Sequence, residues 1–203
     1  RERIAAMLGE RRAPRWVGTF HATGVKILRR DLAFNPQFFQ MFKKEADLLR
    51  TLEHPNIVRV YTLGEANRRL YMVMEYIEGQ DLDQVIEESL EPLPQEQVID
   101  WALQICDVLD YLHNHEPGGI VFRDLNPRNV MLDQHGRIVV IDFGIAKVFQ
   151  RGQRGTVIGT AGYPPPEQYR GISEPAGDIY ALGATMHHLL TKRDPRLEPP
   201  FTF

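Results

Sequence analysis

The chain is 203 residues long, enough for a core that buries about 70% of the unfolded surface, which excludes a small scaffold stapled by disulfides. Apolar residues make up 43% and charged residues 25%, and the glycines and prolines form no repeat, so collagen, coiled coils and wholesale disorder are excluded. The 24 basic and 27 acidic residues leave a formal charge of −3, so we expect no nucleic-acid partner.

Few features of the sequence point outside the cytoplasm. The single cysteine, Cys106, cannot form an internal disulfide, which fits a reducing compartment. No apolar run approaches the ~18 residues of a membrane span, so no membrane contact is expected within this segment. We therefore expect a cytoplasmic protein, or the cytoplasmic domain of a longer, membrane-anchored one.

The N-terminal part alternates short β-branched and aromatic runs with turns, a pattern typical of strands. Strands are predicted at residues 24–28, 57–61 and 70–76. One helix interrupts them, and it is predicted from four residues that share a face: Phe38, Phe42, Glu45 and Leu49. His54 precedes a proline and is expected to end this helix, because such a residue is pushed out of the helical region.

After Gly79 the pattern becomes helical. Asp81 is a plausible N-cap for a short helix through Glu88. A longer helix is predicted from an apolar stripe with a period near 3.6: Val98, Trp101, Ala102, Ile105, Leu109 and Leu112. Cys106 lies beside that stripe, and we expect it in the core.

Two apolar strands, predicted at 119–122 and 129–132, flank a polar loop, and a turn then leads into a hairpin strand at 137–141. The stretch 152–166 has no periodicity and is long for a connection, which favours a functional loop. A last helix is predicted from Ile179, Leu182, Met186 and Leu190. The fold class expected is α+β, with a β-rich N-terminal part and a mainly helical remainder.

The polar loop carries the strongest chemical signal. Asp124 lies within it, Asn129 begins the strand after it, and Asp142 follows Asp124 by eighteen residues. Magnesium prefers hard oxygen ligands and takes one or two carboxylates from protein, so Asn129 and Asp142 are the candidate metal ligands. Asp124, left clear of the metal, would orient a hydroxyl group and receive its proton. For either aspartate alone, capping a turn is the simpler interpretation, but the combined spacing favours chemistry.

These motifs resemble the eukaryotic-type (Hanks-type) serine/threonine protein kinases, and Pro166-Glu167-Gln168 suggests a bacterial member. The resemblance implies a two-lobed fold, with an N-terminal lobe at 1–77 and a C-terminal lobe at 78–203. It also implies transfer of the γ-phosphoryl of ATP, with Mg²⁺, to serine or threonine hydroxyls of protein substrates.

The resemblance assigns nucleotide-binding roles by position. Lys26 and Glu45, nineteen residues apart, would pair to hold the α and β phosphates. Taken separately, each residue is more simply interpreted as a solvated surface charge. Backbone groups of Glu75 and Ile77 would bond the adenine, with Met74 as the gatekeeper.

Two further positions are ambiguous. Asp81 matches the residue that accepts from the ribose hydroxyls, and capping its own helix explains it equally well. Met131 matches the apolar floor under the adenine, and it would look the same as a core residue.

The segment 159–167 resembles the end of an activation segment, which favours a peptide acceptor over a small molecule. Thr160 matches a threonine that contacts the catalytic aspartate, and Asp178 matches the aspartate that braces the catalytic loop. Arg123 would pair with a phosphothreonine, for which Thr156 is the candidate. Self-association for autophosphorylation is a corresponding expectation.

Several departures from the family pattern motivate an alternative function. No G-x-G-x-x-G motif precedes Lys26, and Asn126 replaces a lysine expected near the transferring phosphate. Arg128 stands where an arginine serves a similar role in many tyrosine kinases, so it is the candidate replacement. The chain stops at Phe203, so the C-terminal lobe is expected to be truncated.

The alternatives are a pseudokinase, acting as a nucleotide-binding or scaffolding module, and a small-molecule phosphotransferase.

Overall fold

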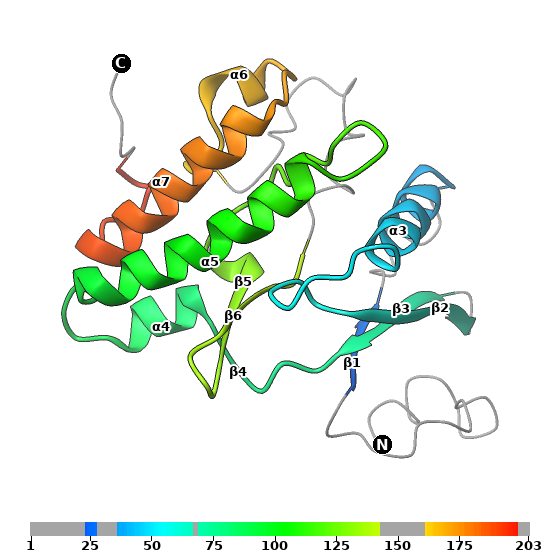
Figure 1. Ribbon diagram of the computed structural model, residues 1–203, viewed down its shortest axis with the longest axis horizontal. Coiled ribbons are helices and arrows are strands. Elements are labelled where there is room, and N and C mark those ends of the chain that lie inside the picture. Colours follow the sequence, from blue (N-terminus) through cyan, green and yellow to red (C-terminus); the bar gives the residue numbers. More distant parts are fainter. Residues whose placement is uncertain (1–22, 28–35, 67–68, 143–160, 199–203) are drawn as a thin grey trace. The chain divides into compact units, whose positions relative to one another are not determined.

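The computed structural model describes residues 23–27, 36–66, 69–142 and 161–198 (Figure 1). These residues form two compact units. The first lies within residues 1–53 and 58–77, and the second comprises 54–57 and the chain from 78 onward. The lobe boundaries expected from the sequence stay a prediction.

The first unit is a three-stranded antiparallel sheet with one helix. Its strands are β1 (Thr23–Ile27), β2 (Val60–Ala66) and β3 (Arg69–Glu75), in the order β1-β3-β2. Helix α3 (Pro36–Leu49) contacts β2 and β3 and buries Phe42, Ala46 and Leu49. Burial of this apolar stripe, rather than intrinsic helix propensity, stabilises the helix.

The segment after α3 differs from its prediction. The helix ends at Leu49, before His54, and β2 starts at Val60 rather than at residue 57. Asn56 and Ile57 pair instead with Val140, whose backbone N–H donates to Asn56 O at 2.8 Å. Asn56 Nδ2 also donates to Ile138 O at 2.7 Å. These hydrogen bonds place residues 54–57 in the second unit.

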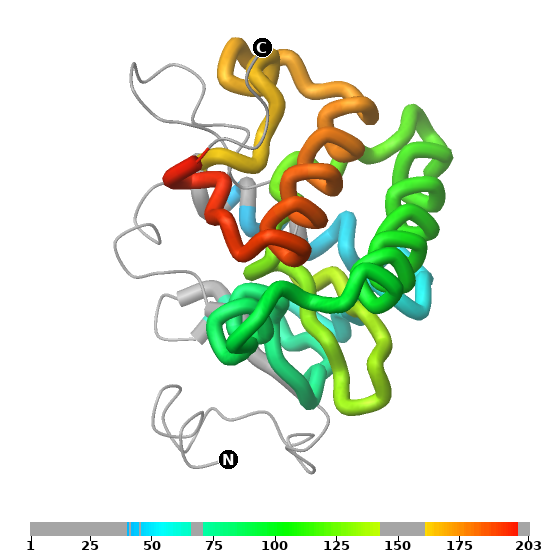
Figure 2. Tube along the Cα trace, turned by 90° about the vertical axis from the view of Figure 1, so that its left-hand side faces the viewer, coloured from blue at the N-terminus to red at the C-terminus, as the bar shows by residue number. Residues whose placement is uncertain are grey.

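The second unit is built on two long antiparallel helices, α5 (Gln95–His113) and α7 (Pro175–Thr191), which lie side by side (Figures 1 and 2). At one end Leu93 N donates to Leu189 O at 3.2 Å, and at the other His113 meets Asp178. The shorter helices are α4 (Leu82–Glu88), η2 (Pro127–Asn129) and α6 (Pro166–Tyr169).

A small antiparallel sheet accompanies these helices. Its strands are β4 (Gly79–Asp81), β5 (Val130–Asp133) and β6 (Ile138–Val140), in that order. The predicted hairpin is therefore present as β5–β6. The strand predicted at 119–122 is absent, because Ile120 N donates to Leu112 O and Phe122 N to a side chain, so these residues have no ladder partner.

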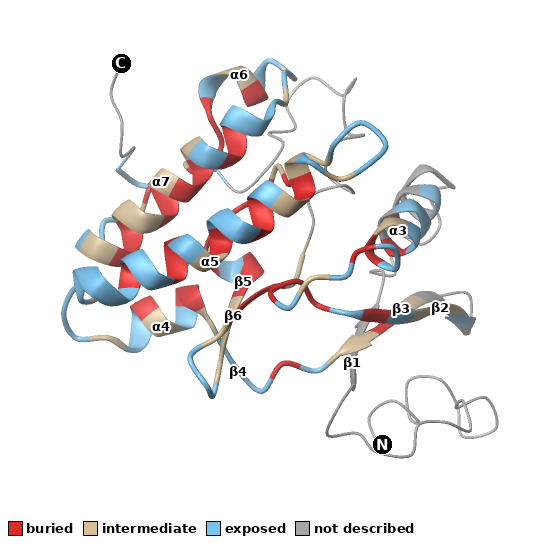
Figure 3. Cartoon of the chain, viewed as in Figure 1, coloured by how far each residue is buried: buried red, intermediate tan, exposed pale blue. Residues whose placement is uncertain are grey.

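The core of the second unit lies between α5 and α7, whose buried faces are visible in Figure 3. The predicted apolar stripe of α5 is buried, but Cys106 is exposed, because it sits 100° around the helix from Ile105. Ile179 was expected on the buried face of α7 and is 53% exposed. That helix is apolar almost all round, so periodicity alone cannot select its buried side. No helix in the described ranges is long and apolar enough to cross a membrane.

Candidate active site

The bend before Asp124 is held by a buried carboxylate. Asp178, in the first turn of α7, is 1% exposed and accepts hydrogen bonds from the backbone N–H groups of Phe122 and Arg123, both at 2.8 Å. His113 Nε2 lies 2.8 Å from the same carboxylate. Arg123 has a positive φ of 72°, a conformation that these bonds stabilise. The predicted brace by Asp178 is therefore confirmed.

The loop after the bend brings the side chains of Asn126 and Asn129 to Asp124. Asn129 Nδ2 donates to Asp124 Oδ2 and to Asp124 O, each at 2.7 Å. Asn126 Nδ2 donates to Asp124 O at 2.8 Å, and its Oδ1 accepts from Arg128 N at 3.1 Å. Asn129 donates through its nitrogen, so its oxygen is the atom that suits a cation. Asn126 is 1% exposed, and its side-chain amide is used in hydrogen bonds within the loop. It therefore cannot replace the lysine that the family has at this position.

The residue before Asp142 is bonded to the same loop, because Ile141 N donates to Asn129 O at 3.0 Å. Asp142 is half-buried. Within the described chain no group of three or more His, Cys, Asp or Glu residues could hold a metal. The oxygens of Asn129 and Asp142 fit Mg²⁺, which completes its shell with phosphate and water when protein supplies few ligands.

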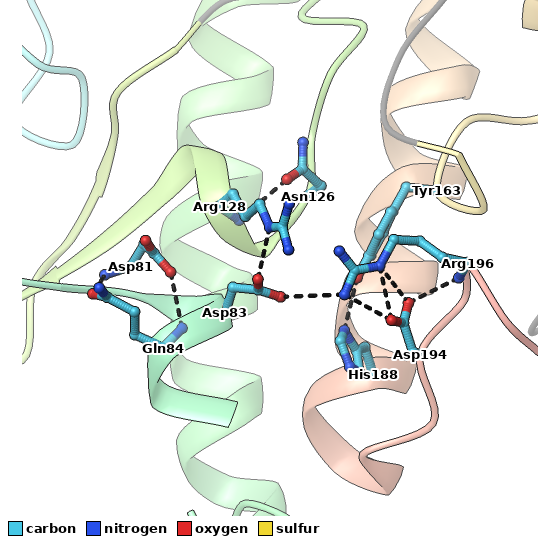
Figure 4. A network of polar contacts seen from close by, with 9 residues as sticks. All are labelled: Asp81, Asp83, Gln84, Asn126, Arg128, Tyr163, His188, Asp194 and Arg196. Atoms are coloured by element: carbon cyan, nitrogen blue, oxygen red, sulfur yellow. Dashed lines mark hydrogen bonds and ion pairs between the residues drawn. The ribbon is translucent and has the colours of Figure 1, made fainter. Parts of the chain in front are cut away.

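Arg128 has a partner that the sequence analysis missed. Its Nε donates to Asp83 Oδ2 at 2.7 Å (Figure 4). Asp83 lies in the first turn of α4, on the buried face with Leu82 and Ile86. A carboxylate on an apolar helix face requires a cationic partner, and this was the available sequence signal.

Arg196, which follows α7, joins the same group of charges. Its Nη2 lies 2.7 Å from Asp194 Oδ2 and 4.0 Å from Asp83 Oδ1. The hydrogen bonds of Arg196 lower the pKa of the Asp194 carboxyl, against the opposing effect of its partial burial, which is the largest single contribution.

The predicted nucleotide residues Asp81 and Met131 are opposite each other in the β4–β5 register. Asp81 Oδ1 accepts from Gln84 N at 2.9 Å, and Gln84 Oε1 accepts from Asp81 N at 3.2 Å, a capping box. The capping role of Asp81 is thus observed, and its ribose contact stays a prediction. Met131 is half-buried rather than core.

In the first unit, Lys26 lies opposite Met72 in β1–β3, and Glu45 lies in α3. The side chains of Lys26 and Glu45 lie outside the described part of the structure. Glu75 N donates to Arg59 O at 2.8 Å, so this N–H does not serve the adenine. Ile77, the last residue of the unit, is buried.

Other predicted positions also lie outside the described residues: Phe143, Gly144, Thr156 and Thr160.

The segment before α6 is anchored to α7 and to the loop. Tyr163 Oη lies 2.7 Å from His188 Nδ1, and both residues are buried. Burial lowers the pKa of His188 and raises that of Tyr163. Gln168 Nε2 donates to Arg123 O at 2.7 Å. Gly162 has a φ of 89°, and a Cβ there would lie 2.2 Å from Pro195 O, so only glycine fits.

The family follows from these motifs and from comparison with known proteins. A model of the protein kinase domain matches residues 19–199. The chain belongs to this family. The predicted family and the predicted α+β kinase fold are both confirmed, and the domain is of the bacterial serine/threonine class.

Curated relatives support that class. The kinase domain is 39% identical over 186 residues to serine/threonine-protein kinase PknB of Mycobacterium leprae, covering 87% of this chain and 28% of that protein. It is 39% identical over 175 residues to serine/threonine-protein kinase PrkC of Bacillus subtilis, covering 84% and 26%. The chain thus spans little more than a quarter of these relatives.

Solved structures agree in fold. The kinase domain of Mycobacterium tuberculosis PknI matches with a TM-score of 0.68 and 30% identity, covering 88% of this chain and 65% of that one. A double mutant of the same domain, C20A_R136A, matches with a TM-score of 0.69.

Proposed function

We propose that this kinase domain transfers the γ-phosphoryl group of ATP to serine or threonine hydroxyls of protein substrates. The observation that carries the proposal is the arrangement of Asp124, whose carboxylate accepts from Asn129 on a loop fixed by buried Asp178. A carboxylate held in this way can orient an acceptor hydroxyl and take its proton.

Other residues of the chain would bind Mg²⁺ and the phosphates of ATP. Asn129 and Asp142 would hold Mg²⁺, which when bound neutralises phosphate charge. Lys26, positioned by Glu45, would contact the α and β phosphates.

The adenosine part of ATP would meet a separate set of residues. Glu75 and Ile77 would bond the adenine through backbone groups, Met131 would lie under the ring, and Asp81 would accept from the ribose. Asp81 can keep its cap while doing so, because a carboxylate has about four acceptor positions.

Asp124→Asn tests the proposal. Phosphoryl transfer to a generic protein acceptor, measured with radiolabelled ATP and Mg²⁺, is expected to fall by at least about a hundredfold, because the base is lost. A thermal shift with Mg²⁺ and nucleotide should persist in this variant. Equal transfer by both proteins would contradict the assignment, and transfer to a small molecule alone would support a phosphotransferase.

Arg128 is the first cationic residue after Asp124, four residues further along the chain. If it replaces the missing lysine, Arg128→Ala should reduce kcat far more than nucleotide affinity, by about a hundredfold. Equal losses in kcat and affinity, or none, would rule this role out.

A pseudokinase is the second candidate, and the buried amide of Asn126 favours it, since no lysine side chain is available there. Nucleotide binding without transfer to any acceptor would support that alternative. Self-association for autophosphorylation is a further proposal, which the concentration dependence of any self-phosphorylation would test.

A further inference from the structure

Four charged side chains alternate in sign beside the catalytic loop: Arg128, Asp83, Arg196 and Asp194 (Figure 4). Arg128 Nε donates to Asp83 at 2.7 Å, and Arg196 Nε donates to both oxygens of Asp194 at 2.8 Å. We call Arg128 and Arg196 the arginine pair. They come from the catalytic loop and from the segment after α7, so only the fold brings them together.

The two signs of charge are not equally exposed. The side chains of Asp83 and Asp194 are 11% and 19% exposed. Those of Arg128 and Arg196 are 54% and 30% exposed. The formal charges cancel, but in each ion pair the arginine side chain is more exposed than the aspartate. An approaching anion therefore meets positive charge first.

The arginine pair retains donors for an anion. A guanidinium has five N–H donors, and among the described residues no hydrogen bond uses the two terminal nitrogens of Arg128. The aspartates hold both guanidinium groups in place, so less side-chain entropy is lost when an anion binds.

The arginine pair also adjoins the parts that would meet an acceptor. Arg128 N donates to Asn126, whose amide donates in turn to Asp124 O. On the other side, Pro195 packs against Gly162, in the segment anchored by Tyr163 and His188. The arginine pair thus adjoins both the loop that carries Asp124 and the segment before α6.

We propose that the arginine pair binds an anionic group of the acceptor polypeptide, a carboxylate or a phosphate, close to the phosphorylated hydroxyl. This inference rests on the proposed function and specifies its substrate class: protein acceptors whose serine or threonine is flanked by acidic or already phosphorylated residues.

Three peptides test the inference, identical except for the residues flanking one serine, which are glutamine, glutamate or phosphoserine. The kcat/KM for the glutamate peptide is expected to exceed that for the glutamine peptide about fivefold at low salt. The advantage should shrink at about 0.5 M salt, because an exposed charge pair is screened. A larger advantage for phosphoserine would identify phosphate as the preferred anion, and a larger advantage for glutamate would identify a carboxylate.

Arg196→Gln and Arg128→Gln should each bring the glutamate-to-glutamine ratio toward one. Arg193→Gln is the matched control, since it removes the same charge from an exposed side chain three residues away, 3.9 Å from exposed Glu198, and should keep the ratio. Thermal melting identifies any variant that fails to fold. Because each arginine is replaced separately, the folded variant still tests the inference if the other one unfolds. A wild-type ratio of one, or a ratio preserved in folded Arg196→Gln, would overturn the inference.

A binding assay separates this inference from the proposed function. Fluorescent peptides with alanine in place of the acceptor serine cannot be phosphorylated there, so their anisotropy measures affinity without turnover. Tighter binding of the glutamate form, lost in Arg196→Gln, supports the anion site. If no peptide is phosphorylated in the same experiments, the proposed function is contradicted and the anion site is not. Equal binding of both forms, in protein that phosphorylates serine peptides, overturns the anion site alone.

Discussion

Two carboxylates support the same loop in opposite ways. Asp178 is buried and accepts from two backbone N–H groups, with His113 beside it. Asp83 accepts from the side chain of Arg128, which is 54% exposed. The first carboxylate reaches the backbone before Asp124, and the second reaches a side chain four residues after it.

The difference shows which support fixes the loop and which adjusts it. Backbone donors lose no side-chain entropy when they bond, and salt does not screen a buried carboxylate. The ion pair of Arg128 with Asp83 restricts a long, exposed arginine side chain and is screened by salt, so it contributes little to stability. We infer that Asp178 sets the loop's conformation, whereas Asp83 sets the position of one cation.

The largest effect is expected at the buried support. Asp178→Asn removes the charge and turns one acceptor atom into a donor facing the N–H groups of Phe122 and Arg123. We expect a loss of about 3 kcal/mol in the free energy of unfolding, measured by urea denaturation. Asp107→Asn is the matched control, because Asp107 also pairs with a histidine, His54, but is 71% exposed. Equal losses in the two variants would remove the distinction between buried and exposed supports.

A smaller effect is expected at Asp83, a buried carboxylate whose partner Arg128 is 54% exposed. Asp83→Asn should cost about 1 kcal/mol or less in the free energy of unfolding, because Arg128 can turn to water. A double-mutant cycle with Arg128→Gln, repeated at high salt, would measure the coupling, which should decrease as salt rises. Coupling that salt leaves unchanged would show that this pair behaves like the buried one.

The smallest effect concerns pH and the buried pair of Tyr163 and His188. Burial lowers the pKa of His188, so the folded state disfavours the protonated ring, while in the unfolded chain the ring has the ordinary histidine pKa of about 6.5. Stability should therefore be complete above about pH 7 and fall as pH drops through 6.5 toward the lower folded pKa. The melting temperature should decline in that window, and His188→Gln should flatten it.

The carboxylates give a separate pH window. The pKa values of Asp133 and Asp194 are lowered in the folded state, so their contribution is lost only as pH falls below about 4. A decline confined to that lower range, with none near pH 6, would contradict the role given to His188.

Local sequence signals predicted local structure well. Asp81 caps α4 as expected, the stripe of α5 is buried, and the hairpin at β5–β6 forms. Each depends on residues within one continuous helix or one tight turn, so the necessary information lies close together in the chain. The motif around Asp124 likewise indicated the family.

Apart from the brace by Asp178, which the family resemblance supplied, contacts between distant residues were not predicted. Residues 119–122 looked like a strand, but the N–H group of Ile120 donates to Leu112 in α5 and that of Phe122 to Asp178. Cys106 looked buried and is exposed.

The chain alone therefore determined the long helices, the cap of α4 and the motif that indicates the family, because periodicity, capping and motif spacing act over short separations. Asp83 and Arg128 are 45 residues apart, and Phe122 and Asp178 are 56 apart. Those pairings depended on packing in three dimensions, since a buried charge takes whichever partner the fold brings within reach.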